Sequence, residues 1–152
     1  MNRFTVSSLV VSAAALIGIA VSEGYRGEAY VPVKGDVATI GFGSTGGVKM
    51  GDKTTPERAL ITLLKDVDHH ANGIKACIQV PLYQREFDAY TSLAFNIGVN
   101  AFCKSTLVNK LNTGDYAGAC AEILRWDKFQ GKPLRGLTLR RQAEYKTCIG
   151  KP

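Results

Sequence analysis

Residues 23–43 read EGYRGEAYVPVKGDVATIGFG, a stretch that brings a glutamate, a glycine-rich turn, a second carboxylate and a threonine close together. Apolar and polar residues alternate over residues 30–42 around the turn pair Gly35-Asp36, which predicts a small β-hairpin. The glycines at positions 41 and 43 would let a bulky ligand approach the backbone closely. The stretch therefore predicts a hairpin that carries a candidate binding loop.

The rest of the chain has a mainly helical pattern. Thr55-Pro56 predicts a helix start, because threonine caps helices and proline suits the first turn. Apolar residues at helical spacing follow it as far as Ile74. Further helices are predicted at residues 83–97, 105–114, 115–126 and 137–149. The expected fold class is therefore α+β, with one mainly helical body and a small β wing near the N-terminus.

Length and composition are those of one ordinary globular domain. The chain has 152 residues, of which 45% are hydrophobic and 21% are charged, so wholesale disorder is excluded. The net charge is +6, and residues 125–152 account for all of it, with eight basic and two acidic residues. Such a tail suits an anionic partner, namely nucleic acid, anionic lipid or a cell-wall polymer, or else forms a solvated helical face.

The cysteines at positions 77, 103, 120 and 148 are too far apart in sequence for a C-x-x-C zinc site, and we expect no metal. Their even number suits two disulfides in an exported protein, for which three pairings exist. We favour Cys77–Cys103 and Cys120–Cys148, because each pair would tie together neighbouring helical segments. Four reduced, buried cysteines in a cytosolic protein are the alternative.

The N-terminal residues 4–21, FTVSSLVVSAAALIGIAV, carry no charge and are just long enough to cross a bilayer. Three interpretations compete: a cleaved signal peptide, a buried helix of a soluble domain, and an anchor that leaves the membrane at modest cost. Arg3 precedes the segment, so the positive-inside tendency places Glu23 outside the cytoplasm. We favour the releasable anchor, because cleavage would remove the helix that must carry Glu23.

The carboxylates of residues 23–43 suggest a hydrolytic site. Glu23 is expected to be half-buried at the end of an apolar helix, where desolvation favours a neutral carboxyl group and general-acid catalysis. A second carboxylate and a threonine hydroxyl that holds a water would complete the groups that cleavage of a glycosidic bond needs. Residue types alone therefore suggest glycoside hydrolysis.

Ordered motifs along most of the chain resemble those of the phage-type lysozymes, also called endolysins. EGYR at 23–26, AY at 29–30 and TIGFG at 39–43 resemble the catalytic signature of that family. Later motifs are FDA at 87–89, AFNIG at 94–98, STL at 105–107, LNTGD at 111–115, RW at 125–126, and GL, RR and Glu144 within 136–144. The uncharged N-terminus is similar to that of the subgroup with a signal-arrest-release anchor, made by phages of Gram-negative hosts.

The resemblance implies a lysozyme-like fold, with a helical body, an N-terminal hairpin wing and a cleft between them. Residues 1–22 would be a signal-anchor segment that refolds as the first helix, and residues 23–152 a single catalytic domain. The N-terminal segment would be held at the host inner membrane while the enzyme is inactive. Release into the periplasm would activate it. We expect a monomer without a nucleic-acid partner.

Carried over to this chain, the family pattern makes Glu23 the general acid and Thr39 the residue that positions the attacking water. The family's usual aspartate position is Pro32 here, so we assign the second carboxylate to Asp36, whose turn would bring it over the cleft. A structural role for Asp36 in the turn beside Gly35 is the alternative.

The substrate-binding residues are expected to be Gly41, Phe42 and Gly43, and no cofactor is implied. Ser44 replaces a histidine that often follows this Gly-x-Gly motif in the family.

The expected reaction is inverting hydrolysis of the β-1,4 bond between N-acetylmuramic acid and N-acetylglucosamine in peptidoglycan, which lyses the host. A lytic transglycosylase that uses Glu23 alone is the main rival, because the usual aspartate is missing. A non-enzymatic cationic protein that disrupts membranes through the basic tail is a second rival. His69 and His70 are expected to be solvated, and Trp126 to be a packing residue.

Overall fold

The computed structural model describes residues 2–152, so residue 1 of the predicted anchor segment lies outside the described residues. Ala13–Asp68 form one compact unit, and His69–Pro152 form a larger one together with residues 2–12. The boundary between the two units falls within helix α2, Pro56–Lys75.

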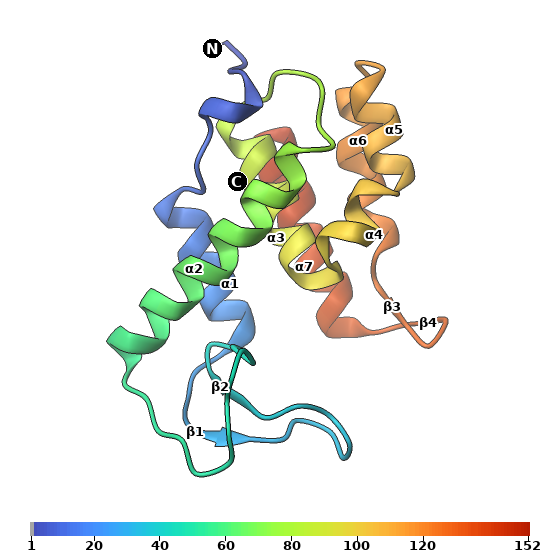
Figure 1. Cartoon of the computed structure of the whole chain (residues 1–152). Coiled ribbons are helices and arrows are strands. Elements are labelled where there is room, and N and C mark those ends of the chain that lie inside the picture. The colour runs from blue at the N-terminus through green and yellow to red at the C-terminus, as the bar shows by residue number, and fades with distance from the viewer. Residues whose placement is uncertain (1) are drawn as a thin grey trace. The chain divides into compact units, whose positions relative to one another are not determined.

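The smaller unit contains α1 (Ala13–Glu23), strands β1 (Arg26–Tyr30) and β2 (Thr39–Gly41), and the first part of α2 (Figure 1). The two strands are antiparallel, with Arg26 opposite Gly41 and Tyr30 opposite Thr39. The predicted hairpin at residues 30–42 is therefore present, although its first strand begins earlier. Helix α1 begins at Ala13, whereas the uncharged run begins at residue 4.

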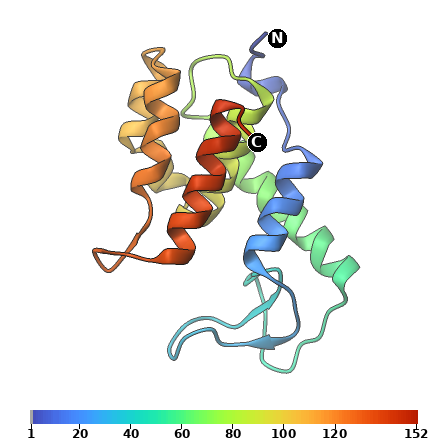
Figure 2. The ribbon, with the colours of Figure 1, turned by 180° about the vertical axis from the view of Figure 1, so that it is seen from behind.

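The larger unit is a helical body built around α3 (Gln84–Ile97), much of which is buried. The other elements in it are η1 (Val6–Ser8), α4 (Val99–Cys103), α5 (Thr106–Asn112), α6 (Tyr116–Glu122), η2 (Ile123–Arg125), β3 (Lys128–Phe129), β4 (Lys132–Pro133) and α7 (Arg135–Ile149). Helices α5 and α6 lie side by side in both views (Figures 1 and 2).

Local capping signals account for several of these helix ends. Ser105 Oγ accepts a hydrogen bond from the Val108 amide at 3.4 Å, and Asp115 accepts one from the Gly118 amide at 2.8 Å. Gly98, with φ of 91°, ends α3 as predicted. The predicted helix at 115–126 is wrong at its end, because α6 stops at Glu122 and continues as a 3₁₀ turn. Helix α7 begins two residues before the predicted start.

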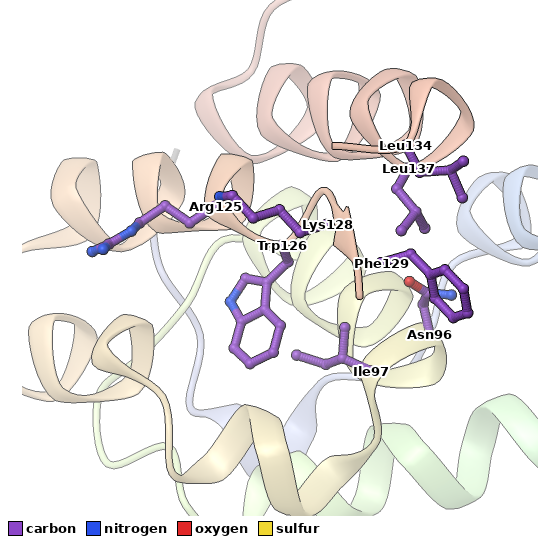
Figure 3. Close-up of a pocket in the computed structure, with 8 residues that line it drawn as sticks. All are labelled: Asn96, Ile97, Arg125, Trp126, Lys128, Phe129, Leu134 and Leu137. Carbon is purple, nitrogen blue, oxygen red and sulfur yellow. The ribbon is translucent and has the colours of Figure 1, made fainter. Parts of the chain in front are cut away.

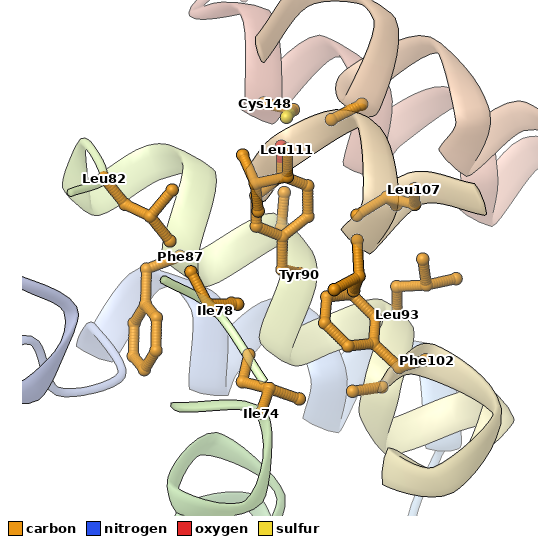
Figure 4. Close-up of a cluster of buried hydrophobic side chains, with 14 of the residues drawn as sticks. Ile74, Ile78, Leu82, Phe87, Tyr90, Leu93, Phe102, Leu107, Leu111 and Cys148 are labelled. Carbon is orange, nitrogen blue, oxygen red and sulfur yellow. The ribbon is translucent and has the colours of Figure 1, made fainter. Parts of the chain in front are cut away.

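A hydrophobic core fills the larger unit (Figure 4). Its fully buried side chains include Ile74, Leu82, Phe87, Tyr90, Leu93, Phe102, Leu107 and Leu111. Leu9, from the uncharged N-terminal run, belongs to the same cluster. Burying these side chains is the main favourable contribution to folding, at about 1.5–3 kcal/mol for each large apolar side chain.

Both favoured disulfides are present, and each links two helical regions of the larger unit. The Cα atoms are 5.6 Å apart in Cys77–Cys103 and 5.8 Å apart in Cys120–Cys148. Among residues 2–152 no cysteine is free, so the interpretation as four reduced thiols does not hold. The pairing joins the turn that follows α2 to α4, and α6 to α7.

Arg141 and Glu144 form an ion pair at i, i+3 spacing on α7. Arg141 is fully buried, and its Nε lies 2.7 Å from Oε2 of Glu144. Arg140 Nε also lies 3.4 Å from Oε1 of Glu144. Burial raises the pKa of Glu144, and the positive charge of Arg141 opposes that rise. These side chains tie α7 to α3, because Ser92 donates to Glu144 at 2.7 Å.

No helix in the described part of the chain is both long and apolar enough to cross a bilayer. Helix α1 has eleven residues, and Phe4 instead forms an isolated antiparallel bridge with Leu82.

Candidate active site

Glu23 is the last residue of α1, and its side chain is half-buried. The helix ends there because Gly24 takes a positive φ of 71°, and its amide still donates to the Ala20 carbonyl at 3.0 Å. The predicted half-buried position of Glu23 at the end of an apolar helix is therefore confirmed.

A tight loop at residues 40–44 lies against Glu23. Ile40 and Ser44 close the loop with two reciprocal backbone hydrogen bonds of 2.9 and 3.0 Å. Within it, Gly43 has φ of +85°, and a Cβ built on it would lie 3.1 Å from Oε2 of Glu23. The glycine therefore lets the carboxylate approach the backbone, and the structure brings these two predicted residues together.

The adjacent Gly41 is constrained by packing. It has φ of +67°, and a Cβ built on it would lie only 2.8 Å from the Cβ of Ala59 on α2. The close approach that this glycine permits is thus an approach of the loop to a helix. The Phe42 ring is half-buried and lies 5.4 Å from the Tyr25 ring between centroids.

Ser44 connects the loop to α2. Its side chain is buried, with 6% of the residue exposed, and Oγ donates to Oδ2 of Asp66 at 2.9 Å. The sequence pointed to Ser44 only as a replacement and did not single out Asp66. Asp66 has no local sequence signal, and in the structure it is half-buried beside Val67, which lies on the apolar stripe of the helix.

Thr39 is buried, with 6% exposed, on β2 opposite Tyr30. Its hydroxyl donates to the Val37 carbonyl at 3.2 Å, so the oxygen atom retains acceptor capacity. A hydroxyl of this kind can hold a water molecule, although its own proton is committed to the backbone.

Asp36 lies in the exposed turn between the strands. Its amide donates to the Val33 carbonyl at 2.9 Å, and its Oδ1 accepts from the Val37 amide at 2.8 Å. These are the contacts of a turn residue, and the carboxylate is exposed to solvent. Glu28, the other nearby acid, pairs with Lys53 at 3.2 Å on the surface.

A separate pocket lies within the larger unit (Figure 3), with a volume of about 440 Å³. It is lined by Asn96, Ile97, Arg125, Trp126, Lys128, Phe129, Leu134 and Leu137. In Figure 3 the side chain of Ile97 points toward the indole of Trp126. Trp126 was predicted to be a packing residue, and it packs beside the core while also lining this pocket.

Within residues 2–152, no group of three or more histidine, cysteine, aspartate or glutamate side chains is arranged to hold a metal ion. His69 is exposed, as expected. His70 is half-buried instead, with its ring 5.1 Å from the Phe95 ring in an edge arrangement, because it packs on an aromatic side chain.

Comparison with known proteins matches this chain to one family. The phage lysozyme model matches residues 20–144. An endolysin of Acyrthosiphon pisum secondary endosymbiont phage 1 is 44% identical over 138 residues, covering 88% of this chain and 94% of that protein. A SAR-endolysin of Pseudomonas phage phiKMV is 37% identical over 141 residues, covering 90% and 87%.

A solved structure shares the fold. The endolysin from Escherichia coli O157:H7 phage FAHEc1 superposes with a TM-score of 0.84 at 33% identity, covering 95% of this chain and 98% of that one. The mainly helical lysozyme-like fold with a small N-terminal hairpin is thereby confirmed. Because the family model spans well over half of the chain, this protein belongs to the phage lysozyme family, whose members degrade peptidoglycan.

Proposed function

We propose that Glu23 is the general acid with which this peptidoglycan hydrolase cleaves the β-1,4 bond between N-acetylmuramic acid and N-acetylglucosamine. The observation that carries the proposal is the position of the half-buried Glu23 against the backbone of Gly43. Oε2 of Glu23 lies 3.1 Å from the point that a Cβ on Gly43 would occupy. A glycine there keeps the acid side chain at the loop without steric conflict. Glu23 would donate its proton to the bridging oxygen while the C1–O bond breaks.

Water completes the reaction in this proposal. A water oriented by the Thr39 hydroxyl adds to C1 from the opposite face of the sugar, and the Asp36 carboxylate accepts the proton that this water releases. Attack from the face opposite the leaving group inverts the configuration at C1. Gly41, Phe42 and Gly43 form the loop that contacts the sugar.

A lytic transglycosylase is the second candidate, and the position of Asp36 favours it. The carboxylate is exposed and accepts a hydrogen bond from the next amide of its own turn, as a turn residue does. In that reaction Glu23 alone would protonate the leaving oxygen, and its carboxylate would then take the proton of the sugar's own 6-hydroxyl as that oxygen bonds to C1 and closes an anhydro ring. The two candidates therefore differ in their products.

Activity of a Glu23→Gln variant tests the assignment of the acid. Glutamine keeps the size of the side chain and removes the proton donor, so muralytic activity should disappear while the thermal unfolding transition stays in place. Glu57→Gln is the matched control, because this exposed glutamate lies in the same unit at the start of α2. Full activity of the Glu23 variant would remove the central assignment.

We further propose that residues 1–22 anchor the inactive enzyme in the host inner membrane before release into the periplasm. Relatives named SAR-endolysin support this proposal. In the folded chain, Arg3 instead pairs with buried Glu86 at 2.9 Å, and its guanidinium lies 3.5 Å from the Tyr116 ring centroid. Ser12 donates to both carboxylate oxygens of Asp88, through its amide at 3.0 Å and its hydroxyl at 2.7 Å.

These contacts cannot form while residues 4–21 lie in lipid, so they belong to the released state. No cysteine precedes residue 77, so disulfide exchange with the anchor cannot act as a trigger. Loss of the membrane potential is the trigger that we propose. Membrane fractionation with and without an uncoupler tests it: the protein should leave the membrane after depolarisation. Protein that stays in the membrane, or is never found there, would contradict the proposal.

A further inference from the structure

The loop at residues 40–44 is held on α2 at two points. Gly41 packs on Ala59, where a Cβ would lie 2.8 Å from the alanine Cβ. Ser44 donates to Asp66 at 2.9 Å. Ala59 and Asp66 are seven residues apart, so they lie on the same face of the helix, about 10 Å apart along its axis. A long, regular helix therefore supports both sides of the loop.

Between these two points lies the residue that contacts Glu23. Gly43 directly precedes Ser44 in the chain, and its missing side chain makes room for Oε2 of Glu23. The backbone bonds between Ile40 and Ser44 leave only three residues in the loop. A shift of Ser44 would therefore shift Gly43 by a similar amount, because so short a closed loop cannot absorb it.

The Ser44–Asp66 bond has the features of a specific anchor. Only 6% of Ser44 is exposed, so a hydroxyl without a partner there would carry a desolvation cost. The acceptor is a carboxylate, and hydrogen bonds to ionised acceptors are stronger than those between neutral groups. Serine is also short, so the bond transmits the position of α2 directly to the backbone of residue 44.

We propose that Ser44 and Asp66 are positioning residues that fix Gly43 against Glu23 and so set the orientation of the catalytic acid. This inference rests on the proposed role of Glu23. Neither residue needs to touch the substrate. Their loss should lower kcat mainly, because the acid would be misplaced, with a smaller rise in KM because the displaced Gly43 also belongs to the loop that contacts the sugar.

The test is a double-mutant cycle with Ser44→Ala, Asp66→Ala and the double variant, measured on purified peptidoglycan well below each unfolding temperature. A displacement of a few tenths of an ångström at a catalytic group costs about tenfold in rate, so each single variant should lose about tenfold in kcat. The double variant should lose no more than either single variant, since both remove the same bond.

Asp66→Asn provides the rescue. Its amide oxygen can still accept from the serine hydroxyl, so kcat should stay within about twofold of that of the unmodified protein. A merely structural bond would lower the unfolding temperature of Asp66→Ala without changing kcat per folded molecule. Thr62→Ala and Asp68→Ala are matched controls on α2, since the Thr62 hydroxyl donates to the Arg58 carbonyl of its own helix and Asp68 is exposed.

Unchanged kcat in both single variants, or a change confined to KM, would overturn the inference. If Asp66→Ala does not fold, Ser44→Ala alone decides, since it removes only one oxygen atom. Glu23→Gln is measured in the same series. An active Glu23→Gln variant would refute the proposed function itself, whereas an inactive one alongside a fully active Ser44→Ala variant would refute only the positioning role.

Discussion

Replacing Gly43 by alanine would have two effects, one on the backbone conformation and one on the contact with Glu23. The residue has a left-handed φ of +85°, and an added Cβ would lie 3.1 Å from Oε2 of Glu23. The first feature strains any side chain at this position. The second requires the carboxylate to move by a few tenths of an ångström.

Each effect has an expected magnitude, the first in the free energy of unfolding and the second in kcat. A left-handed conformation costs a non-glycine residue about 1–2 kcal/mol. In a chain of this length that corresponds to a fall in Tm of about 2–8 °C. If Glu23 is the general acid, as proposed, moving it by several tenths of an ångström should lower kcat about tenfold, on the scale of about 10²-fold for 1 Å.

Gly47→Ala is the matched control. Gly47 has a φ of +69°, and an added Cβ would meet no atom within 4 Å, so this position carries the strain without the contact to Glu23. Both variants should lose similar stability in thermal unfolding. Only Gly43→Ala should lose activity, measured as the clearing rate of a peptidoglycan suspension per folded molecule. Equal kcat in the two variants would refute the contact between loop and acid as a requirement for catalysis.

Three further outcomes are expected. Asp36→Asn should lower the rate of peptidoglycan hydrolysis by at least about 10²-fold if its carboxylate is the general base; an unchanged rate would favour the transglycosylase. Lys110 donates a hydrogen bond to Glu122 at 2.7 Å, which lowers the pKa of the Glu122 carboxyl in the folded protein. The ionised Glu122 therefore stabilises the fold above its unfolded pKa of about 4.3, and this stabilisation is lost as the pH falls through its lower folded pKa. The unmodified protein should therefore lose more Tm on acidification than Glu122→Gln, and parallel curves would contradict this. Replacing Cys120 and Cys148 by serine should cost about 3–4 kcal/mol in urea unfolding, from the 28-residue separation, whereas a negligible loss would show that the link does not constrain the unfolded chain.

Elements with strong local signals were predictable from the sequence. The start of α2 at Pro56 and the starts of α5 and α6 after Ser105 and Asp115 follow from capping residues. Helix α4 and the β3–β4 hairpin were not predicted. Elements of two to five residues contain too few positions to establish a period.

The composition of the N-terminal run did not predict where its helix begins. Eighteen uncharged residues indicated one continuous segment, whereas α1 occupies only its second part and continues to Glu23. The first part carries Leu9 into the core of the larger unit. Contacts with residues more than seventy positions away, such as Ser12 with Asp88, determine that break, and no local pattern encodes them.

The candidate site was predictable only in part for the same reason. Glu23, Thr39 and Gly43 lie within the stretch that residue types had already singled out. The supporting bond from Ser44 to Asp66 spans 22 residues, and neither side chain has a local signal that distinguishes it from a solvated one. Gly41 was expected to admit a ligand, and its close packing on Ala59 depends on where α2 lies.

Mass spectrometry of muropeptides tests the central claim most directly. Peptidoglycan digested by the unmodified protein should give fragments with a hydrated, reducing N-acetylmuramic acid end, because a water molecule adds to C1 when the glycosidic bond breaks. The Glu23→Gln variant, folded to the same Tm, should release none. Reducing-end fragments from that variant at the normal rate would contradict the account, and anhydro ends from the unmodified protein would replace hydrolysis by transglycosylation.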